Sequence, residues 1–371
     1  MRSLRIRIIG GSLAGLFSAI LLRRDGHDVK VYERSTEGLG GRGAGLVAQE
    51  DLFSILRLLG LEQVADVGVV AKERIYLDKK GHILQTISMP QMQISWDYLY
   101  NTIASHIDRD HYLLGRQVTH VRDGDDGVEI FFADGSSEAA DLVIGADGIG
   151  SVVRKSLHPN AYENSYAGYV AWRGLMSETQ LPREAAVLLN RFAFYVTPGN
   201  HVLGYLVPGP NGEMEEGSRR YNWVWYRKVS PWNLAAVFTA RDGRQNQFSL
   251  PRGELTLARR DELRLDATEQ LPPQFAYAVK AEETPSIQGI FDYEAPRMIG
   301  KSTVLVGDAA FIVRPHTAMG ASKAAGDVMV LANVLKTSDD LSAALRQFEQ
   351  DRIGVGRQIA AYGRRLGGNV I

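Results

Sequence analysis

A glycine-rich turn between a short strand and a helix constrains the fold of this chain more than any other feature. Leu4–Ile9 alternates apolar and basic residues as a strand does, and Leu13–Arg24 carries apolar residues at helical spacing. Gly10 and Gly11 separate these two segments, and Val29–Glu33 is typical of a second strand. The order strand, glycine turn, helix, strand predicts a βαβ unit and therefore a parallel α/β sheet.

The turn itself has the spacing of a GxGxxG dinucleotide-binding pattern, with Ser12 at the middle glycine position. Gly10 allows a tight turn, Gly15 lets the helix pack close to the strand, and the helix N-terminus offers N–H groups to a pyrophosphate. Glu33 ends the next strand, where a carboxylate accepts hydrogen bonds from an adenosine ribose. A βα turn without a ligand is the alternative, but strand, turn, helix and acid together favour a bound dinucleotide.

A second glycine-rich stretch, Gly38-Leu-Gly40-Gly41-Arg42-Gly43, matches the GxGxxG pattern at all three glycine positions. No strand leads into it and no helix follows it, so the structural context of a dinucleotide site is missing. We expect a loop that lies near the cofactor. Within it, Arg42 either contacts a phosphate or is a solvated loop residue.

Composition excludes several classes of chemistry. The chain has no cysteine, which excludes disulfides, thiolate metal sites, iron–sulfur clusters and a cysteine nucleophile. Its eight histidines show no metal-ligand spacing, so we expect no metal site. A net charge of -1 gives no reason to expect nucleic acid or an anionic membrane as partner. With no signal peptide and no long apolar run, we expect a cytoplasmic protein without a membrane span.

The middle of the chain differs in composition from its two ends. Fifteen of the 32 aromatic residues fall between residues 162 and 250, among short strand-like runs, which predicts an inserted β-rich region. On either side, Asp141–Ile144 and Thr303–Val306 are apolar strands that end at Asp147-Gly148 and Gly307-Asp308. Ligands of open α/β sheets bind at this edge, although each aspartate alone is more often a helix cap. Helices are expected over 318–335 and 341–366.

Three motifs in this order resemble the single-component FAD-dependent aromatic hydroxylases, the p-hydroxybenzoate hydroxylase-like family. They are GGSLAG with YER, then DLVIGADGIGSVVR, then VLVGDAA with RPHTAMGASKAAGDV. The resemblance runs from about residue 4 to about 365. It implies a Rossmann-like FAD-binding domain (1–72, 98–163 and 290–371, with C-terminal helices) and an inserted β-sheet substrate domain (73–97 and 164–289).

The same resemblance implies which residues contact FAD. The glycine turn would hold the pyrophosphate, Glu33 the adenosine ribose, Asp308 the ribityl chain, and the loop from Pro315 to Gly320 the isoalloxazine ring. The expected cofactor-binding residues are Gly10, Ser12, Leu13, Ala14, Gly15, Glu33, Arg34, Arg42, Gly45, Val118, Asp147, Gly307, Asp308, Pro315, Ala318, Gly320 and Ala321.

Three positions depart from the family pattern. Trp96 stands where an arginine is usual, so that one phosphate contact is missing and Arg42 is a candidate replacement. In the flavin loop, where the family has a pair of glycines, this chain has Ala318-Met-Gly320. Gly326 stands directly before Asp327, where the family has a glutamate.

The activity implied by the resemblance is hydroxylation of an electron-rich aromatic ring. NADH or NADPH would visit as reductant, and reduced FAD would react with O2 to form a C4a-hydroperoxide that hydroxylates the substrate in a water-free site. The strings YVAWRG and YLVPG are most similar to members that act on hydroxypyridines, so a hydroxypyridine is the expected substrate.

Candidate substrate residues come from the flavin loop and from the inserted region. His316 and Tyr205 are the catalytic candidates, and Tyr195, Tyr205, Trp223 and His316 are the candidates for substrate contact, each with a structural role as the alternative. Arg173 either orients an anionic ligand or pairs within the sheet. We expect His201 in a hairpin turn and Arg219-Arg220 in a solvated loop.

Two other functions remain open from the sequence. A flavoprotein oxidoreductase of the same fold would transfer hydride without hydroxylation, and a non-catalytic FAD-binding protein would do neither. The partners expected for a hydroxylase are a small aromatic substrate, O2 and NAD(P)H, with the chain acting as a monomer or a homodimer.

Overall fold

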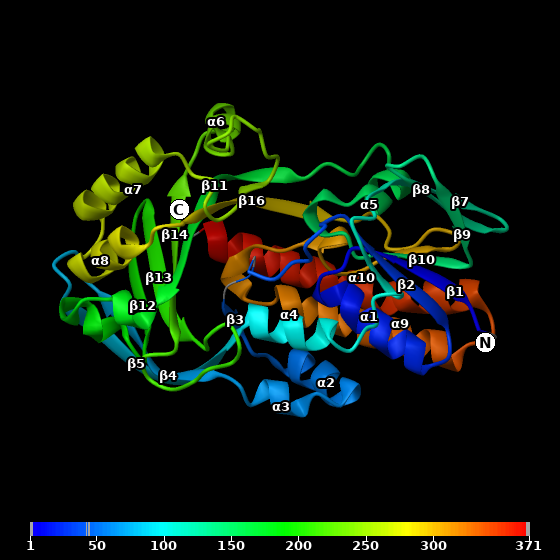
Figure 1. Ribbon diagram of the computed structural model, residues 1–371, viewed down its shortest axis with the longest axis horizontal. Coiled ribbons are helices and arrows are strands. Elements are labelled where there is room, and N and C mark those ends of the chain that lie inside the picture. Colours follow the sequence, from blue (N-terminus) through cyan, green and yellow to red (C-terminus); the bar gives the residue numbers. More distant parts are fainter. Residues whose placement is uncertain (1–2, 42, 44, 369–371) are drawn as a thin grey trace.

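A five-stranded parallel sheet forms one end of the molecule, on the right in Figure 1. The computed structural model describes residues 3–41, 43 and 45–368. The strand order is β17-β10-β1-β2-β6, and every neighbouring pair is parallel. The strands are β1 (Arg5–Ile9), β2 (Asp28–Glu33), β6 (Tyr112–Leu114), β10 (Leu142–Gly145) and β17 (Thr303–Leu305). The predicted parallel α/β sheet is confirmed, and the carboxyl ends of its strands share one edge.

Helices with a mainly apolar packing face cover this sheet. The predicted helix α1 (Leu13–Arg24) has the bounds expected from the sequence, and α9 (Gly320–Thr337) packs against it. The other helices of this half are α2 (Glu50–Leu59), α3 (Glu62–Ala65), α4 (Trp96–Ala104), α5 (Val152–Leu157) and α10 (Leu341–Gly368). The long α10 lies against α9 and extends toward the other half of the molecule (Figure 1). This confirms the expected C-terminal helix.

A small antiparallel sheet is attached to the same half. Its strands are β7 (Val118–Gly124), β8 (Gly127–Phe132) and β9 (Ser137–Ala140). Its apolar residues join the large core cluster of the parallel sheet, so this sheet and the parallel sheet share one core.

A large, mostly antiparallel sheet forms the other half, with α7 (Leu257–Gln270) and α8 (Pro273–Ala281) on its outer face (Figure 1). The strand order is β15-β16-β11-β14-β13-β12-β4-β5-β3, with β18 paired to β16; only β4 and β12 pair in parallel. The strands are β3 (Gly45–Val47), β4 (Val69–Leu77), β5 (Ile83–Ser95), β11 (Ser165–Ser177), β12 (Phe192–Thr197), β13 (Asn200–Val207), β14 (Arg220–Lys228), β15 (Ser249–Leu250), β16 (Ser286–Glu294) and β18 (Phe311–Ile312). The expected inserted β-sheet is confirmed as part of the fold class.

Short helical turns complete the chain. They are α6 (Leu234–Val237) and the 3-10 turns η1 (Gly148–Gly150), η2 (Glu178–Gln180), η3 (Arg183–Leu188), η4 (Pro231–Asn233), η5 (Gly307–Ala309) and η6 (Pro315–Thr317). Of these, η1, η5 and η6 lie next to the expected cofactor residues.

The two faces of the large sheet differ in character because successive residues of a strand point to opposite sides. On the outer face, Tyr221, Trp223 and Trp225 are fully buried in a cluster with residues of α7 and α8. On the inner face, Tyr205 and Tyr226 belong to separate, smaller clusters. The inner face is the one turned toward the cofactor half.

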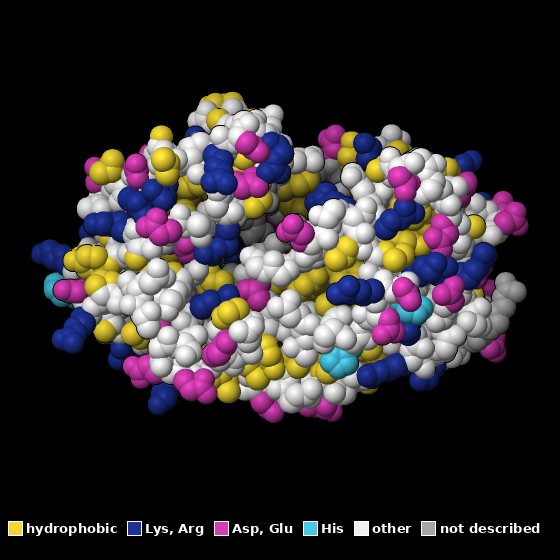
Figure 2. Space-filling view, viewed as in Figure 1, with side chains coloured by type: hydrophobic (Ala, Val, Ile, Leu, Met, Phe, Trp, Pro, Cys, Tyr) yellow, Lys and Arg dark blue, Asp and Glu magenta, His cyan; other side chains and the backbone are white. Residues whose placement is uncertain are grey.

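The molecular surface carries both signs of charge. Lys and Arg side chains are intermixed with Asp and Glu over the face shown in Figure 2, as expected from the near-zero net charge. Among residues 3–41, 43 and 45–368, no helix has the length and apolar character needed to cross a bilayer. The same residues contain no group of three or more His, Asp or Glu side chains arranged for a metal ion.

A buried ion pair links the two halves. Arg220 of β14 donates to Asp97 Oδ2 at 2.9 Å and to Ser95 Oγ at 2.8 Å, at the N-terminus of α4. The neighbouring Arg219 is buried and pairs with Glu178 at 2.7 Å. The expectation of a solvated loop at Arg219-Arg220 is therefore wrong: both guanidinium groups find carboxylates that are distant in the sequence.

We predict that Arg220→Met lowers the free energy of unfolding by about 3–5 kcal/mol, because it leaves a buried carboxylate without its cation. The side chains of Arg220 and Asp97 are 16% and 5% exposed. Urea unfolding measures the effect. The matched control is Arg122→Met, which removes an exposed pair with Glu129 and should cost less than about 1 kcal/mol. Equal losses in the two variants would contradict a special role for Arg220.

Candidate functional site

The glycine turn after β1 is held by contacts that no side chain tolerates. A Cβ on Gly10, whose φ is +106°, would lie 2.4 Å from the carbonyl oxygen of Ala146. A Cβ on Gly15 would lie 2.0 Å from the carbonyl oxygen of Gly10. These contacts press the start of α1 against the ends of β1 and β10, as the sequence pattern predicts.

The N-terminus of α1 is open to a ligand. Ser12 is its N-cap residue but makes no side-chain capping bond, and Leu13 and Ala14 form the first turn, where N–H groups have no intrahelical partner. Tyr112 of β6 holds the turn in place, because its hydroxyl donates to the carbonyl oxygen of Gly11 at 3.0 Å. Such a helix end binds the phosphates of a dinucleotide.

Glu33 is buried at the end of β2, and both of its carboxylate oxygens are oriented by backbone. Oε2 accepts the N–H of Gly11 and Oε1 the N–H of Ser35, each at 2.9 Å. Each oxygen keeps a second lone pair, so the carboxylate remains able to accept ribose hydroxyls. Arg34 follows as an exposed residue, and Val118 begins β7 in the core.

The two aspartates at the carboxyl edge differ in how they are used. Asp147 accepts hydrogen bonds from Ser151 Oγ and from the N–H groups of Val152 and Val153, at 2.7 and 3.2 Å for the last two, and so caps α5. The Asp308 side chain is 50% exposed beside the buried Gly307. Asp308 is thus the more available to a cofactor, and cofactor contact by either residue stays a prediction.

The loop before α9 is anchored and locally strained. Arg314 donates to both carboxylate oxygens of Asp292, at 2.7 to 3.2 Å, just before Pro315. Ala318 has a left-handed backbone with φ of +54°, which costs an alanine roughly 1–2 kcal/mol. This is one of the positions where the family pattern has glycine. Gly320 and Ala321 then form the first turn of α9.

The second glycine-rich stretch is fastened to α4. Leu39 N–H donates to the Tyr100 hydroxyl and Gly41 N–H to Asp97 Oδ1, both at 3.1 Å. Trp96 stacks on Tyr100 with ring centroids 5.0 Å apart and contributes no charge in place of the family's arginine. Arg42, the candidate replacement, lies outside the described residues.

The residues at this edge fit FAD. An open helix N-terminus accepts a pyrophosphate, an oriented carboxylate accepts a ribose, and an exposed carboxylate at Asp308 accepts a polyol. One βαβ unit with a glycine turn is present in the described chain, which provides a fold for one resident dinucleotide.

A row of aromatic and imidazole rings lies on the inner side of the large sheet, next to the loop before α9. His316 Nε2 lies 2.9 Å from the Tyr169 hydroxyl, and the His316 ring lies 4.3 Å from that of Tyr226. The rings of His201 and His316 are 5.7 Å apart. The two catalytic candidates lie on this face, since Tyr205 follows His201 by four residues on β13 and points to the same side.

His201 is the residue that the sequence misplaced. It lies in β13 rather than in the hairpin turn, is 7% exposed, and has no hydrogen-bond partner on either ring nitrogen among the described residues. Burial lowers its pKa to about 4. Burial, with repulsion from His201 and Arg314, lowers the pKa of His316 to about 3. Both rings are neutral at pH 7.

Further polar atoms on the inner face lack partners. Within the described chain, Arg173 Nε and both amide atoms of Asn222 are buried without a hydrogen bond. Asn222 is the neighbour of Tyr205 in the strand register. Burial also raises the pKa of Tyr205 to about 12, so its hydroxyl stays protonated and donates to the Gly45 carbonyl at 3.3 Å. The sequence pattern of the strand does not indicate that Asn222 is a buried residue of the inner face.

The other two substrate candidates face away from this row. Tyr195 and Trp223 belong to the outer core cluster with α7 and α8. The structure therefore brings His316 and Tyr205 to one face, together with His201, Arg173 and Asn222, and places Tyr195 and Trp223 on the other. Contact of any of them with substrate stays a prediction.

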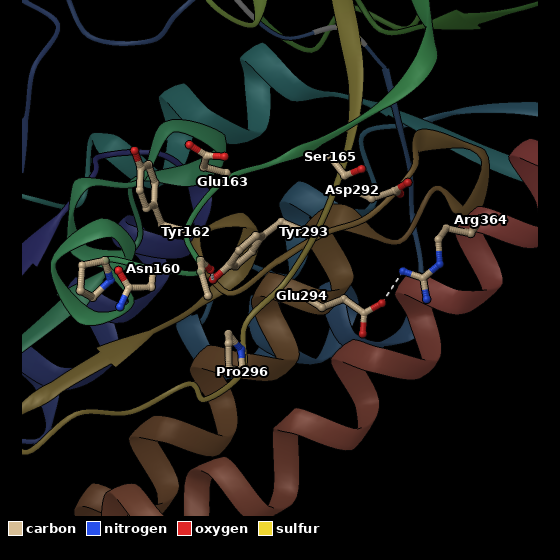
Figure 3. Close-up of a pocket in the computed structure, with 11 residues that line it drawn as sticks. Asn160, Tyr162, Glu163, Ser165, Asp292, Tyr293, Glu294, Pro296 and Arg364 are labelled. Carbon is tan, nitrogen blue, oxygen red and sulfur yellow. Dashed lines mark hydrogen bonds and ion pairs between the residues drawn. The ribbon is translucent and has the colours of Figure 1, made fainter.

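A surface cavity of about 660 Å³ lies outside this site (Figure 3). It is lined by residues 159–163, by Ser165 and Arg364, and by the end of β16, including Asp292 and Glu294. Two of its acidic groups are paired, Glu294 with Arg364 and Asp292 with Arg314, and Glu163 is a third carboxylate in the lining. None of the expected cofactor or substrate residues lines it, and its carboxylates disfavour a phosphate-bearing ligand.

Comparison with known proteins agrees with this geometry. A family model described as FAD binding domain-like matches residues 166–292, and one described as NAD(P)-binding Rossmann-like domain matches residues 8–55. The chain is similar to 2,6-dihydroxypyridine 3-monooxygenase of Paenarthrobacter nicotinovorans, with 31% identity over 95% of this chain and 88% of that protein. It is also similar to 3-amino-4-hydroxybenzoate 2-monooxygenase of Streptomyces cremeus, with 29% identity over 98% and 87%.

The structure of 2,6-dihydroxypyridine-3-hydroxylase from Arthrobacter nicotinovorans superposes with a TM-score of 0.93, at 29% identity over 99% of this chain and 93% of that chain. The relatives are named as monooxygenases, which selects hydroxylation over the two alternatives left open by the sequence. The chain belongs to the FAD-dependent aromatic-ring monooxygenases of the p-hydroxybenzoate hydroxylase-like family.

Proposed function

We propose that this enzyme hydroxylates a hydroxypyridine. The observation that carries the proposal is the set of buried polar atoms without partners on the inner face of the large sheet, at His201, Arg173 and Asn222. Buried polar groups are otherwise nearly always hydrogen-bonded. A small ring that carries both a nitrogen and hydroxyl groups supplies the missing donors and acceptors, and aromatic side chains surround the same place.

Arg173 supplies the charge that this substrate needs. No ion pair of Arg173 occurs among the described residues. Its neighbours in the strand register, Val224 on β14 and Ser286 on β16, carry no charge. Its guanidinium therefore holds the oxygen of a deprotonated hydroxypyridine. The deprotonated ring is more electron-rich, and so more reactive toward an electrophilic oxygen.

The two histidines orient the ring rather than carry its charge. Their low pKa values oppose full proton transfer to either ring, so His201 and His316 act as neutral donors or acceptors. Tyr169 holds His316 Nε2, which leaves Nδ1 for the substrate. The Tyr205 hydroxyl stays protonated and donates to the Gly45 carbonyl, so at the other end of the row its oxygen serves the substrate as a hydrogen-bond acceptor.

Bound FAD supplies electron transfer from NAD(P)H and the activation of O2. The protein contributes the position of the ring and the exclusion of water. The ring centroid of Phe192 lies 4.6 Å from that of Tyr205 and 4.8 Å from that of Phe194. These contacts extend the apolar row along the sheet. A dry site of this kind limits loss of the activated oxygen to water.

A hydroxybenzoate is the second candidate substrate. The unpaired guanidinium of Arg173 fits a ring carboxylate as well as a ring oxyanion. His201 and Asn222 favour the hydroxypyridine, because they offer hydrogen bonds where a benzene ring has only C–H groups.

The proposal is tested with purified enzyme, NADH or NADPH, and a panel of hydroxypyridines and hydroxybenzoates. We expect substrate-dependent oxygen uptake and a product one oxygen atom heavier with at least one hydroxypyridine. Efficient hydroxylation of hydroxybenzoates with failure of every hydroxypyridine would overturn the substrate assignment. NAD(P)H oxidation that yields only peroxide with all compounds would also count against it.

For Arg173→Met we expect KM for the hydroxypyridine to rise about 10- to 100-fold, the range for losing a hydrogen bond to a charged group. Steady-state oxygen uptake gives KM, and perturbation of the flavin absorbance gives the substrate Kd. The matched control is Arg227→Met on the outer face, where Arg227 pairs with Asp266. An unchanged KM and Kd in Arg173→Met would exclude Arg173 from substrate binding.

Acid should destabilise the enzyme through its buried histidines. The pKa of His201 is lowered from 6.5 to about 4 in the folded chain, so the unfolded chain binds its proton first as the pH falls. Stability is full above about pH 6.5 and is lost toward pH 4, by up to about 3 kcal/mol for His201 alone. Urea unfolding between pH 7 and pH 4.5 should show a shallower loss in His201→Asn than in the wild type.

The control for this pH series is His106→Asn, because His106 is exposed and has no carboxylate partner among the described residues. Its unfolding free energy should follow the wild type at every pH. If the curve of His201→Asn runs parallel to that of the wild type, His201 is not held neutral by the fold.

A further inference from the structure

A lysine is buried without a hydrogen-bond partner in the cofactor half. Lys323, in the first turns of α9, is 1% exposed. Its Nζ has no hydrogen-bond partner among the described residues. Asp308 Oδ1 at 3.9 Å and Asp327 Oδ2 at 4.0 Å are within ion-pair range of Nζ but too far for hydrogen bonds. An ammonium group has three N–H donors, and none of them is satisfied here.

The inner of the two carboxylates is committed to other groups. Asp327 accepts the N–H of Gly307 at 3.0 Å and Arg352 Nε at 2.8 Å, and both charged side chains are buried. Asp308, by contrast, is half exposed toward the cleft. The Lys323 ammonium therefore lies between a carboxylate occupied by other groups and the half-exposed carboxylate of Asp308.

Asp308 follows Gly307 at a place where two helices begin. Gly307 fits between them, because a Cβ there would lie 3.3 Å from Ala14 Cβ in α1 and 3.6 Å from Ala324 Cβ in α9. Ala14 is in the first turn of α1 and Ala324 is the neighbour of Lys323. Both helix N-termini carry partial positive charge, which favours oxygen-rich and anionic ligands.

The missing acceptor for Lys323 is thus an oxygen atom of a ligand bound beside Asp308, near the N-termini of α1 and α9. A buried cation without hydrogen bonds is costly, whereas a hydrogen bond from an ammonium to an oxygen of a bound anion is among the strongest in proteins. The central part of FAD, its pyrophosphate and the ribityl chain joined to it, carries such oxygens.

We propose that Lys323 is a cofactor-binding residue whose ammonium donates to an oxygen in the ribityl–pyrophosphate part of FAD. The same ammonium then lies between the cofactor and the half-exposed carboxylate of Asp308. The protein without FAD then carries an unsatisfied buried cation, and FAD binding relieves it. This inference concerns the cofactor alone and does not depend on which ring is hydroxylated.

Titration of FAD into the apoprotein, followed by flavin fluorescence, tests the proposal. For Lys323→Met we expect FAD to bind about 10- to 100-fold more weakly, as for the loss of a charge-assisted hydrogen bond. Lys323→Arg keeps the cation and should retain most of the affinity. The control is Lys336→Met at the other end of α9, where the lysine is exposed and pairs with Asp25; its affinity for FAD should equal that of the wild type.

Thermal unfolding of the apoprotein separates this role from a structural one. Removing an unsatisfied buried cation should leave the apo Tm of Lys323→Met equal to or above that of the wild type, while the increase in Tm on adding FAD becomes smaller. An unchanged FAD affinity, or a lower apo Tm with the FAD-dependent increase intact, would overturn the proposal. If Lys323→Met is insoluble, the same measurements on Lys323→Gln decide.

A second titration with ADP identifies the oxygen. ADP has the pyrophosphate but no ribityl chain. Weaker ADP binding by Lys323→Met assigns the contact to a phosphate oxygen, and a loss confined to FAD assigns it to the ribityl chain; both outcomes support the proposal.

Discussion

Close backbone packing at Gly10 and Gly15 is the constraint on which the cofactor half depends. The end of β1, the end of β10 and the first turn of α1 meet within distances that exclude a Cβ atom at either glycine. As a result, N–H groups and helix ends rather than side chains line this edge of the sheet. Gly307 lies where α9 approaches α1, with looser contacts but with a left-handed φ of +60° that favours glycine. The glycine-rich composition of the chain thus has a structural reason at a few positions, while many other glycines serve turns.

The two faces of the large sheet differ, because one forms a core with α7 and α8 and the other is the face that we propose binds the substrate. The outer residues of β14 are large and apolar in their contacts, and α7 and α8 cover them completely. The inner residues of the same strands include His201, Asn222 and Arg173, whose buried polar atoms have no partners within the described chain. Alternation along a strand places the two sets on opposite faces, although Tyr221 Oη and Trp223 Nε1 on the outer face also lack partners among the described residues. A ligand that hydrogen-bonds the inner set gives these residues the partners that the fold leaves out.

Much of the cofactor half was predictable because its signals are local. The strand, turn and helix around Gly10 follow from periodicity within about 30 residues, and the bounds of α1 agree with the structure. The inner face of the large sheet was harder. In the run Tyr221–Tyr226 nearly every residue is bulky, so the sequence does not show that Trp223 points outward and Asn222 inward. The sequence predicts a turn at His201 because it follows Pro198-Gly199 closely. The turn is shorter than expected, however, and β13 already begins at Asn200.

Long-range partners explain the remaining differences. Arg220 is paired with Asp97, 123 positions earlier in the chain, and no local pattern connects the two. Lys323 has the spacing of an ordinary polar residue in a helix, and only the packing of α9 against α1 and α10 reveals that it is buried. Burial of a polar group is a property of the whole fold, whereas a motif is a property of a few neighbouring residues.

If the proposed function holds, the unsatisfied buried groups of the inner face also determine selectivity. An aromatic ring that lacks matching donors and acceptors would leave His201, Arg173 and Asn222 unpaired, at a cost of about 1–3 kcal/mol for each group. Sites that hydrogen-bond a substrate reject analogues without the bonding group far more strongly than apolar pockets reject a missing methylene. The same reasoning applies to Lys323 and the cofactor. A chain with this arrangement is expected to discriminate between rings by their polar atoms and to gain stability when FAD is bound, because both ligands complete hydrogen bonds that the protein leaves open.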